Sequence, residues 1–85
     1  WTIMLSTPPT PGLEARPRKV GDELTLRGRG NKTVKKLFID EKIPRRDREH
    51  IPVVADSHGV LALAGFGMNT VHPAYGTVAL TCEKN

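Results

Sequence analysis

The stretch RGRGNKTVKKLFIDEKIPRRDREHIP, residues 27–52, decides the fold of this chain. Val34, Leu37 and Phe38 lie at positions i, i+3 and i+4, which places them on one face of a helix that can pack on a sheet. Pro44 ends this helix or opens a second one, because proline has no N–H to donate and suits the first helical position. The stretch therefore predicts two short helices, the first of them anchored by its apolar face.

Basic residues gather in the same stretch. Residues 27–48 contain nine Lys or Arg and three acidic residues, a net charge of +6, whereas the rest of the chain has a net charge of −2. Such a basic region on a slightly acidic body indicates an anionic partner that approaches from one side. A solvated basic face without a partner is the alternative. The basic residues of the helices that lie off the apolar stripe are Lys32, Lys35, Lys36, Arg45, Arg46 and Arg48.

Short apolar or alternating segments flank the helices and predict strands. We expect a single domain over residues 1–85 with an α+β fold, in which a small, mostly antiparallel sheet carries two short helices on one face. Asn31 is the expected N-cap of the first helix, and three prolines make residues 7–12 a stiff connector. The expected strands are residues 1–6, 13–18, 23–27, 53–55, 60–64 and 76–82.

Cysteine usage and hydropathy indicate the compartment. Cys82 is the single cysteine, so the chain forms no internal disulfide and suits a reducing, cytoplasmic location. We expect Cys82 to be a buried strand thiol rather than a nucleophile. No apolar run approaches the roughly 18 residues of a membrane span, so we expect no membrane contact. Because the chain begins at Trp1 without an initiator Met, we also expect it to be part of a longer protein.

Residues with catalytic chemistry are scarce. His50, His58 and His72 are too far apart in sequence for the short pairing of zinc sites, and we expect each to be a turn or surface residue. No phosphate-binding loop, nucleophile elbow or zinc-protease motif occurs. The composition therefore favours a binding domain over an enzyme, and a small enzyme that uses Cys82 or a histidine is the least favoured alternative.

Aromatic residues narrow the class of partner. The chain has four, and one of them, Phe38, belongs to the apolar stripe, so no series of rings is available to stack on unpaired bases. Double-stranded RNA is recognised mostly through its shape, phosphates and 2′-hydroxyls. The residues alone therefore predict a domain that binds the backbone of structured RNA.

Three ordered motifs resemble the C-terminal domain of tRNA-isoleucine lysidine synthetase. They are an Arg-rich segment ending in Gly-Asp at residues 16–22, a Lys-rich helix ending in FIDEKIP at residues 32–44, and Arg48 followed by IPVV at residues 51–54. The resemblance covers about residues 13–65. One departure is Gly67, since the family often has a basic residue at that position.

This resemblance implies a function. The parent enzyme attaches lysine to the wobble cytidine of an isoleucine tRNA and uses ATP in an N-terminal catalytic domain, whose Ser-Gly-Gly-x-Asp-Ser loop does not occur in this sequence. The resemblance implies a domain that has no cofactor of its own, binds the acceptor stem of tRNA and has the N-terminal catalytic domain as a second partner. The implied phosphate contacts are Lys32, Lys35, Lys36, Arg45, Arg46 and Arg48, with Arg16, Arg18 and Arg27 as second-rank positions.

Several of these residues also have a structural interpretation. Arg48 suits the cap of a helix end, Lys36 is an i,i+4 partner for Asp40, and Asp22 suits a turn in which its carboxylate bonds to its own backbone. A second function also stays open for the domain as a whole. In that alternative it is a protein-interaction or interdomain docking module, whose apolar hairpin at residues 60–66 packs on a partner.

Overall fold

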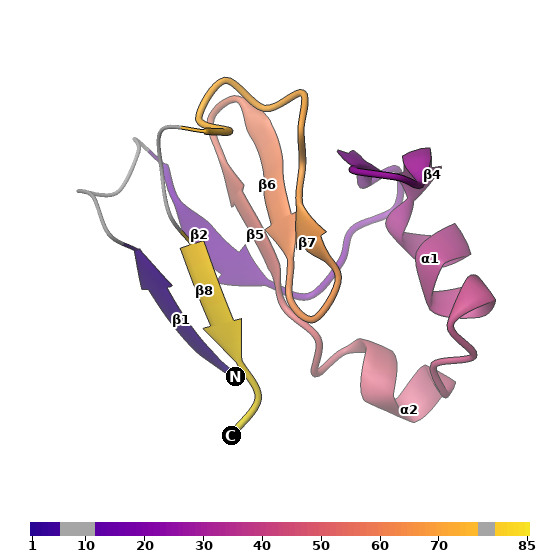
Figure 1. The fold of residues 1–85 in the computed structure, drawn as a ribbon. Helices are drawn as coiled ribbons and strands as arrows, with labels where there is room; N and C mark the ends of the chain where they lie inside the picture. The colour runs from indigo at the N-terminus through magenta and orange to yellow at the C-terminus, as the bar shows by residue number, and fades with distance from the viewer. Residues whose placement is uncertain (6–11, 77–79) are drawn as a thin grey trace.

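A four-stranded antiparallel sheet lies at the centre of the computed structural model, which describes residues 1–5, 12–76 and 80–85 (Figure 1). The order of the strands in this sheet is β2–β5–β6–β7. Two smaller antiparallel sheets pair β1 with β8 and β3 with β4. The strands are β1 (Thr2–Leu5), β2 (Glu14–Arg16), β3 (Glu23–Leu26), β4 (Gly30–Thr33), β5 (Val53–Asp56), β6 (Gly59–Leu63), β7 (Gly67–Met68) and β8 (Leu80–Glu83).

The antiparallel pairing and the two helices confirm the coarse fold prediction, a small single domain. The strands are nevertheless divided among three sheets rather than gathered in the one predicted. The expected connector lies almost wholly outside the described residues, as does the middle of the expected last strand. No helix in residues 1–5, 12–76 and 80–85 is long and apolar enough to cross a membrane.

Helix α1 (Val34–Asp40) begins later than the sequence predicted. Asn31 is not its N-cap, because residues 30–33 form β4, where Asn31 pairs with Thr25. The cap is Thr33, whose side-chain oxygen accepts a hydrogen bond from the Lys36 N–H at 3.1 Å. The second helix, α2 (Arg45–Arg48), follows Pro44, so this proline opens the second helix.

The central sheet is covered on both faces (Figure 1). On one face α1 and the β3–β4 hairpin pack on β5 and β6, and on the other face the β1–β8 pair does so. Val34, Leu37 and Phe38 are completely buried, which confirms the predicted stripe. Helix α2 buries no residue. The first face holds Leu24, Leu26, Val34, Leu37, Phe38, Val53, Ala55, Val60 and Leu63, and the second holds Val54, Leu61, Ala62 and Ala74.

A β-bulge in β6 shifts the register of its pairing with β5. Val54 pairs with Ala62 and Ala55 pairs with Val60, which leaves Leu61 as the extra residue. Leu61 and Ala62 therefore belong to the same apolar cluster, although neighbouring strand residues normally point to opposite faces. Residues 60–64 are all buried, because the central sheet is covered on both faces.

The completely buried Phe38 gives a test of this packing. Phe38→Ala should lower the free energy of unfolding by about 3–5 kcal/mol, because it leaves a cavity where the ring contacts Phe66 at a centroid distance of 6.0 Å. Lys35→Ala, on the exposed side of the same helix, should cost well under about 1 kcal/mol. Thermal melts of the two variants provide the measurement, and equal losses would show that α1 packs with the opposite face.

Candidate nucleic-acid interface

A groove of about 680 Å³ lies between the loop that follows β2 and the two helices. Four of its seven lining residues are basic and one is acidic. Within the described parts of the chain, no ion pair neutralises any of the four cations. The groove is therefore a site of concentrated positive charge. Its lining residues are Pro17, Arg18, Val20, Lys35, Arg45, Arg48 and Glu49.

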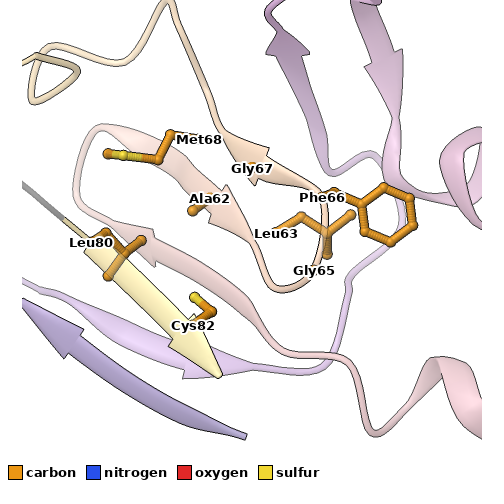
Figure 2. A pocket seen from close by; sticks show the side chains of 8 residues that line it. All are labelled: Ala62, Leu63, Gly65, Phe66, Gly67, Met68, Leu80 and Cys82. Carbon is orange, nitrogen blue, oxygen red and sulfur yellow. The ribbon is translucent and has the colours of Figure 1, made fainter. Parts of the chain in front are cut away.

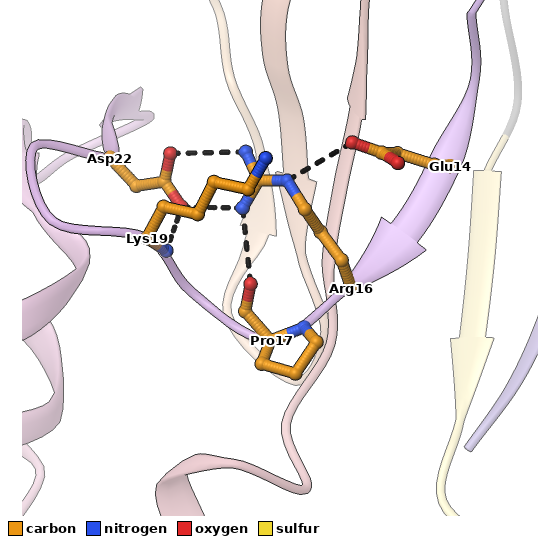
Figure 3. A network of polar contacts seen from close by, with 5 residues as sticks. All are labelled: Glu14, Arg16, Pro17, Lys19 and Asp22. Carbon is orange, nitrogen blue, oxygen red and sulfur yellow. Dashed lines mark hydrogen bonds and ion pairs between the residues drawn. The ribbon is translucent and has the colours of Figure 1, made fainter.

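An ion pair between Arg16 and Asp22 fixes the loop that forms one wall of this groove (Figure 3). Arg16 donates from Nη1 and Nη2 to the two carboxylate oxygens of Asp22, at 2.7 and 3.1 Å, and from Nη1 to the Pro17 carbonyl at 3.1 Å. Its Nε donates to Glu14 at 3.2 Å. The guanidinium thus makes its hydrogen bonds within the domain. Arg16 holds the loop in shape and does not line the groove.

Asp22 connects the same loop to helix α1. Its carboxylate accepts a hydrogen bond from the Lys19 N–H at 2.7 Å, which confirms the expected turn role. Its backbone carbonyl accepts from the N–H of Val34, the first residue of α1, at 2.9 Å. Burial acts to raise the pKa of Asp22, but the hydrogen bonds from Arg16 and Lys19 outweigh it, and the pKa is lowered. The carboxylate is therefore charged wherever the fold is intact near neutral pH.

The helices supply the other basic groups. Lys35 is exposed on α1 and Arg45 on α2. Arg48 is half-buried: its Nε donates to the Ile43 carbonyl at 2.9 Å, and its guanidinium carbon lies 6.0 Å from the centre of the Phe38 ring. Arg48 therefore has a structural contact, but to the turn between the two helices rather than to a helix end, and its side chain also lines the groove.

The predicted contact residues separate into two groups in space. Arg18, Lys35, Arg45 and Arg48 line the groove. Lys32 and Lys36 instead share Asp40, at 3.2 and 3.1 Å, which confirms the i,i+4 pairing of Lys36. Their hydrogen bonds lower the pKa of Asp40. The residues that do not line the groove are Arg16, Arg27, Lys32, Lys36 and Arg46.

Three lining residues, Pro17, Val20 and Glu49, were not predicted from the sequence as part of a site. Pro17 and Val20 lie in the Arg-rich segment at residues 16–22, which carries the family resemblance, but only the arginines of this segment were predicted to contact a ligand. Val20 is 96% exposed, an unusual position for valine, and it stands at the rim of the groove.

An apolar pocket of about 250 Å³ lies between β6, β7 and β8 (Figure 2). Figure 2 shows Leu80 and Cys82 projecting from β8 toward Ala62 of β6. Burial raises the pKa of the half-buried Cys82 thiol, so the reactive thiolate is disfavoured. This agrees with the predicted structural role of the cysteine. Among the described residues, no three His, Cys, Asp or Glu side chains gather in a metal-binding cluster.

The lowered pKa of Asp22 predicts a dependence of stability on pH. A carboxylate whose pKa is lower in the folded state stabilises the fold above its unfolded pKa of about 4, and this contribution disappears as the pH falls through the folded pKa. The melting temperature of the parent chain should therefore fall below about pH 4 more steeply than that of Asp22→Asn. At neutral pH the variant should be less stable by about 1–3 kcal/mol.

Glu23→Gln is the matched control, because Glu23 is exposed on β3 and, in the described part of the chain, has no ion pair. This variant should keep the acid sensitivity of the parent. Identical pH profiles for Asp22→Asn and the parent chain would show that the Arg16 pair contributes nothing.

Comparisons with known proteins agree with one another on the family. A family model described as the TilS substrate C-terminal domain matches residues 13–78. A crystal structure of a TilS C-terminal domain superposes with a TM-score of 0.66 at 26% identity, over 98% of this chain and 72% of that one. The tRNA(Ile)-lysidine synthase of Clostridioides difficile is 44% identical over 55 residues, and that of Bacillus subtilis is 46% identical over 48 residues.

These matches cover 65% and 55% of this chain but only 12% and 10% of the two synthases. The chain therefore spans about a tenth of the length of the curated relatives that it matches. The matched region includes the loop, both helices and the central sheet, so the groove lies wholly within it. The chain belongs to the TilS substrate C-terminal domain family.

Proposed function

We propose that the groove binds the phosphates of a tRNA acceptor stem, and that the chain serves as the tRNA-binding domain of an ATP-dependent tRNA-isoleucine lysidine synthetase. The observation that carries the proposal is the set of four cations, free of ion pairs within the described residues, around one groove of about 680 Å³. The relatives are tRNA(Ile)-lysidine synthases, and this supports tRNA as the ligand.

The residue types in the groove suit a duplex backbone. Arg18, Arg45 and Arg48 carry planar guanidinium groups that can bind two phosphate oxygens at once, and Lys35 adds a compact point charge. None of the seven described lining residues is aromatic, so the groove offers no ring on which a base could stack. A duplex presents its phosphates and keeps its bases stacked inside, and such a groove is complementary to it.

The proposal assigns the chemistry to another part of the enzyme. ATP and lysine belong to the N-terminal catalytic domain, which is the second partner of this domain, and residues 1–85 hold no cofactor. The role of the domain is to position tRNA, because phosphate contacts fix register and orientation without reading the sequence. A cytoplasmic location, where tRNA is modified, is part of this proposal.

The alternative of a docking module has less support. It relied on an apolar surface along residues 60–66, yet residues 60–64 are buried within this domain. Phe66 is half-buried and packs at a centroid distance of 6.0 Å from Phe38. The hairpin is therefore part of the core, and it leaves little apolar surface for a second protein.

The dependence of tRNA affinity on salt tests the groove. With about four phosphate contacts, the slope of log affinity against log salt should be on the order of −3 to −4. Lys35→Gln and Arg45→Gln should each flatten this slope by about one unit, because each removes one contact, and both should weaken different tRNAs by similar factors. Fluorescence anisotropy at several salt concentrations gives the slopes.

Two lysines supply controls for that experiment. Lys36 is the neighbour of Lys35 but pairs with Asp40, so Lys36→Gln should change the slope less than Lys35→Gln does. Lys84, near the C-terminus, should have no effect when it is changed to Gln. Equal effects of Lys35→Gln and Lys84→Gln would contradict the proposal, because they would mean that binding follows total charge and not the groove.

The assignment of catalysis to another domain gives a further test. The chain alone should neither hydrolyse ATP nor exchange pyrophosphate with it, because its sequence has no nucleotide-binding loop. Radiolabelled pyrophosphate exchange, with and without tRNA and lysine, gives the measurement. Lysine-dependent formation of lysidine by these 85 residues would overturn the assignment.

A further inference from the structure

A third pocket, smaller than the groove and the apolar pocket, lies at the tip of the β3–β4 hairpin, apart from the groove. Its volume is about 190 Å³, and it combines cationic and aromatic groups, a combination that the groove lacks. Tyr75 is 42% exposed, a large exposure for an aromatic side chain. Gly67 also lines the pocket and contributes no side chain. The side chains that matter for its chemistry are Arg27, Arg29, Phe66, Thr70 and Tyr75.

Buried polar residues fix the segment that carries Tyr75. Asn69 is 7% exposed: its side chain accepts a hydrogen bond from the Thr25 N–H at 2.9 Å and donates to the Val60 carbonyl at 2.8 Å. The N–H of Thr70 donates to the Thr25 carbonyl at 2.8 Å. The start of the segment is thus bound to both β3 and β6, through groups that are costly to bury without partners.

His72 holds the other end of the same segment. The prediction that it is a turn or surface residue was wrong in part, because it lies in a turn but is only 5% exposed. Its Nε2 lies 2.8 Å from the Asp56 carboxylate, and its Nδ1 accepts from the Ala74 N–H at 2.9 Å. The Tyr75 N–H donates to the His72 carbonyl at 2.9 Å. The backbone of Tyr75 is therefore held in place, although its ring faces solvent.

The two arginines differ in how they are held. Arg29 pairs with Glu41 at 3.0 Å, which ties the tip of the hairpin to the end of α1. Arg27 is exposed and, in the described part of the chain, has neither an ion pair nor a side-chain hydrogen bond. A guanidinium without a partner among the described residues thus lines the same pocket as an exposed ring whose backbone is held in place.

From this arrangement we infer that the pocket binds an unpaired nucleotide of the same RNA, with the base stacked on Tyr75 and a phosphate on Arg27. The inference deepens the proposed function and rests on it. Every base has a π-face, so stacking on a tyrosine and a phosphate contact to arginine together suit a single-stranded segment of any sequence. A double-stranded segment cannot use the pocket, because its bases are already stacked in the helix.

The path of the chain connects this pocket to the groove. Strand β4 runs from the hairpin tip directly into α1, where Lys35 lines the groove. Four strand residues span on the order of 13 Å at about 3.3 Å each, so one short strand separates the hairpin tip from the helix. An overhang of four nucleotides, which has about this length when stacked, is therefore a suitable probe for the pocket.

The experiment compares three RNA hairpins that share one duplex: a blunt form, a form with a four-nucleotide 3′ overhang and a form with a four-nucleotide 5′ overhang. One of the overhangs should bind the chain on the order of tenfold more tightly than the blunt form. Tyr75→Leu should abolish this gain without changing the affinity for the blunt form, and Tyr75→Phe should keep it. Arg27→Gln should reduce both the gain and its dependence on salt.

The outcomes separate the inference from the proposed function. If all three hairpins bind equally, and Lys35→Gln weakens them alike, the inference about the pocket fails. The proposal that the groove binds phosphates is then still supported. If the gain survives Tyr75→Leu, the overhang binds elsewhere and the inference fails again. If no hairpin binds at all, both proposals fall. A 2-aminopurine in the overhang gives a second readout, since its fluorescence should be quenched by stacking in the parent chain and in Tyr75→Phe but not in Tyr75→Leu.

Discussion

The ion pair between Arg16 and Asp22 is the constraint on which the groove depends. It closes the loop between β2 and β3 and, through the Asp22 carbonyl and the Val34 N–H, joins that loop to the start of α1. The two side chains are 16% and 11% exposed, so the cost of removing them from water offsets much of the attraction between them. The pair therefore contributes less to overall stability than to geometry: it places Arg18 opposite the helices, where its charge adds to theirs.

The sequence predicted the parts of the fold that depend on local pattern. The stripe of Val34, Leu37 and Phe38 and the strands β5 and β6 follow from the spacing of apolar residues, whereas the sequence left open whether Pro44 ends the first helix or opens the second. Strand β4 was missed because Gly-Asn-Lys-Thr has little tendency to form a strand by itself, and pairing with β3 supplies what the sequence lacks. The bulge at Leu61 and the division into three sheets depend on contacts between distant segments, which no local pattern records.

For the candidate site as well, the sequence predicted local features but not contacts between residues. Charge counts identify which residues are basic, but not which of them are already paired. Lys35 and Lys36 are adjacent in sequence, yet Lys36 shares Asp40 with Lys32, while Lys35 lines the groove. Arg16 resembled the other arginines until its partner six residues away was known. Because each of these pairings depends on the folded backbone, the composition overestimates how many cations are available to a ligand.

Both surfaces proposed for RNA are built on loops that polar side chains hold in place. Asp22 fixes the loop beside the groove, while Asn69 and His72 fix the segment that carries Tyr75. A domain of this size has a thin core, and apolar packing alone leaves such loops with many conformations. A loop that is ordered before binding loses less conformational entropy when the ligand arrives, so more of the contact energy appears as affinity. The buried polar groups therefore serve recognition: they hold the exposed cations and the tyrosine in the positions that a ligand would contact.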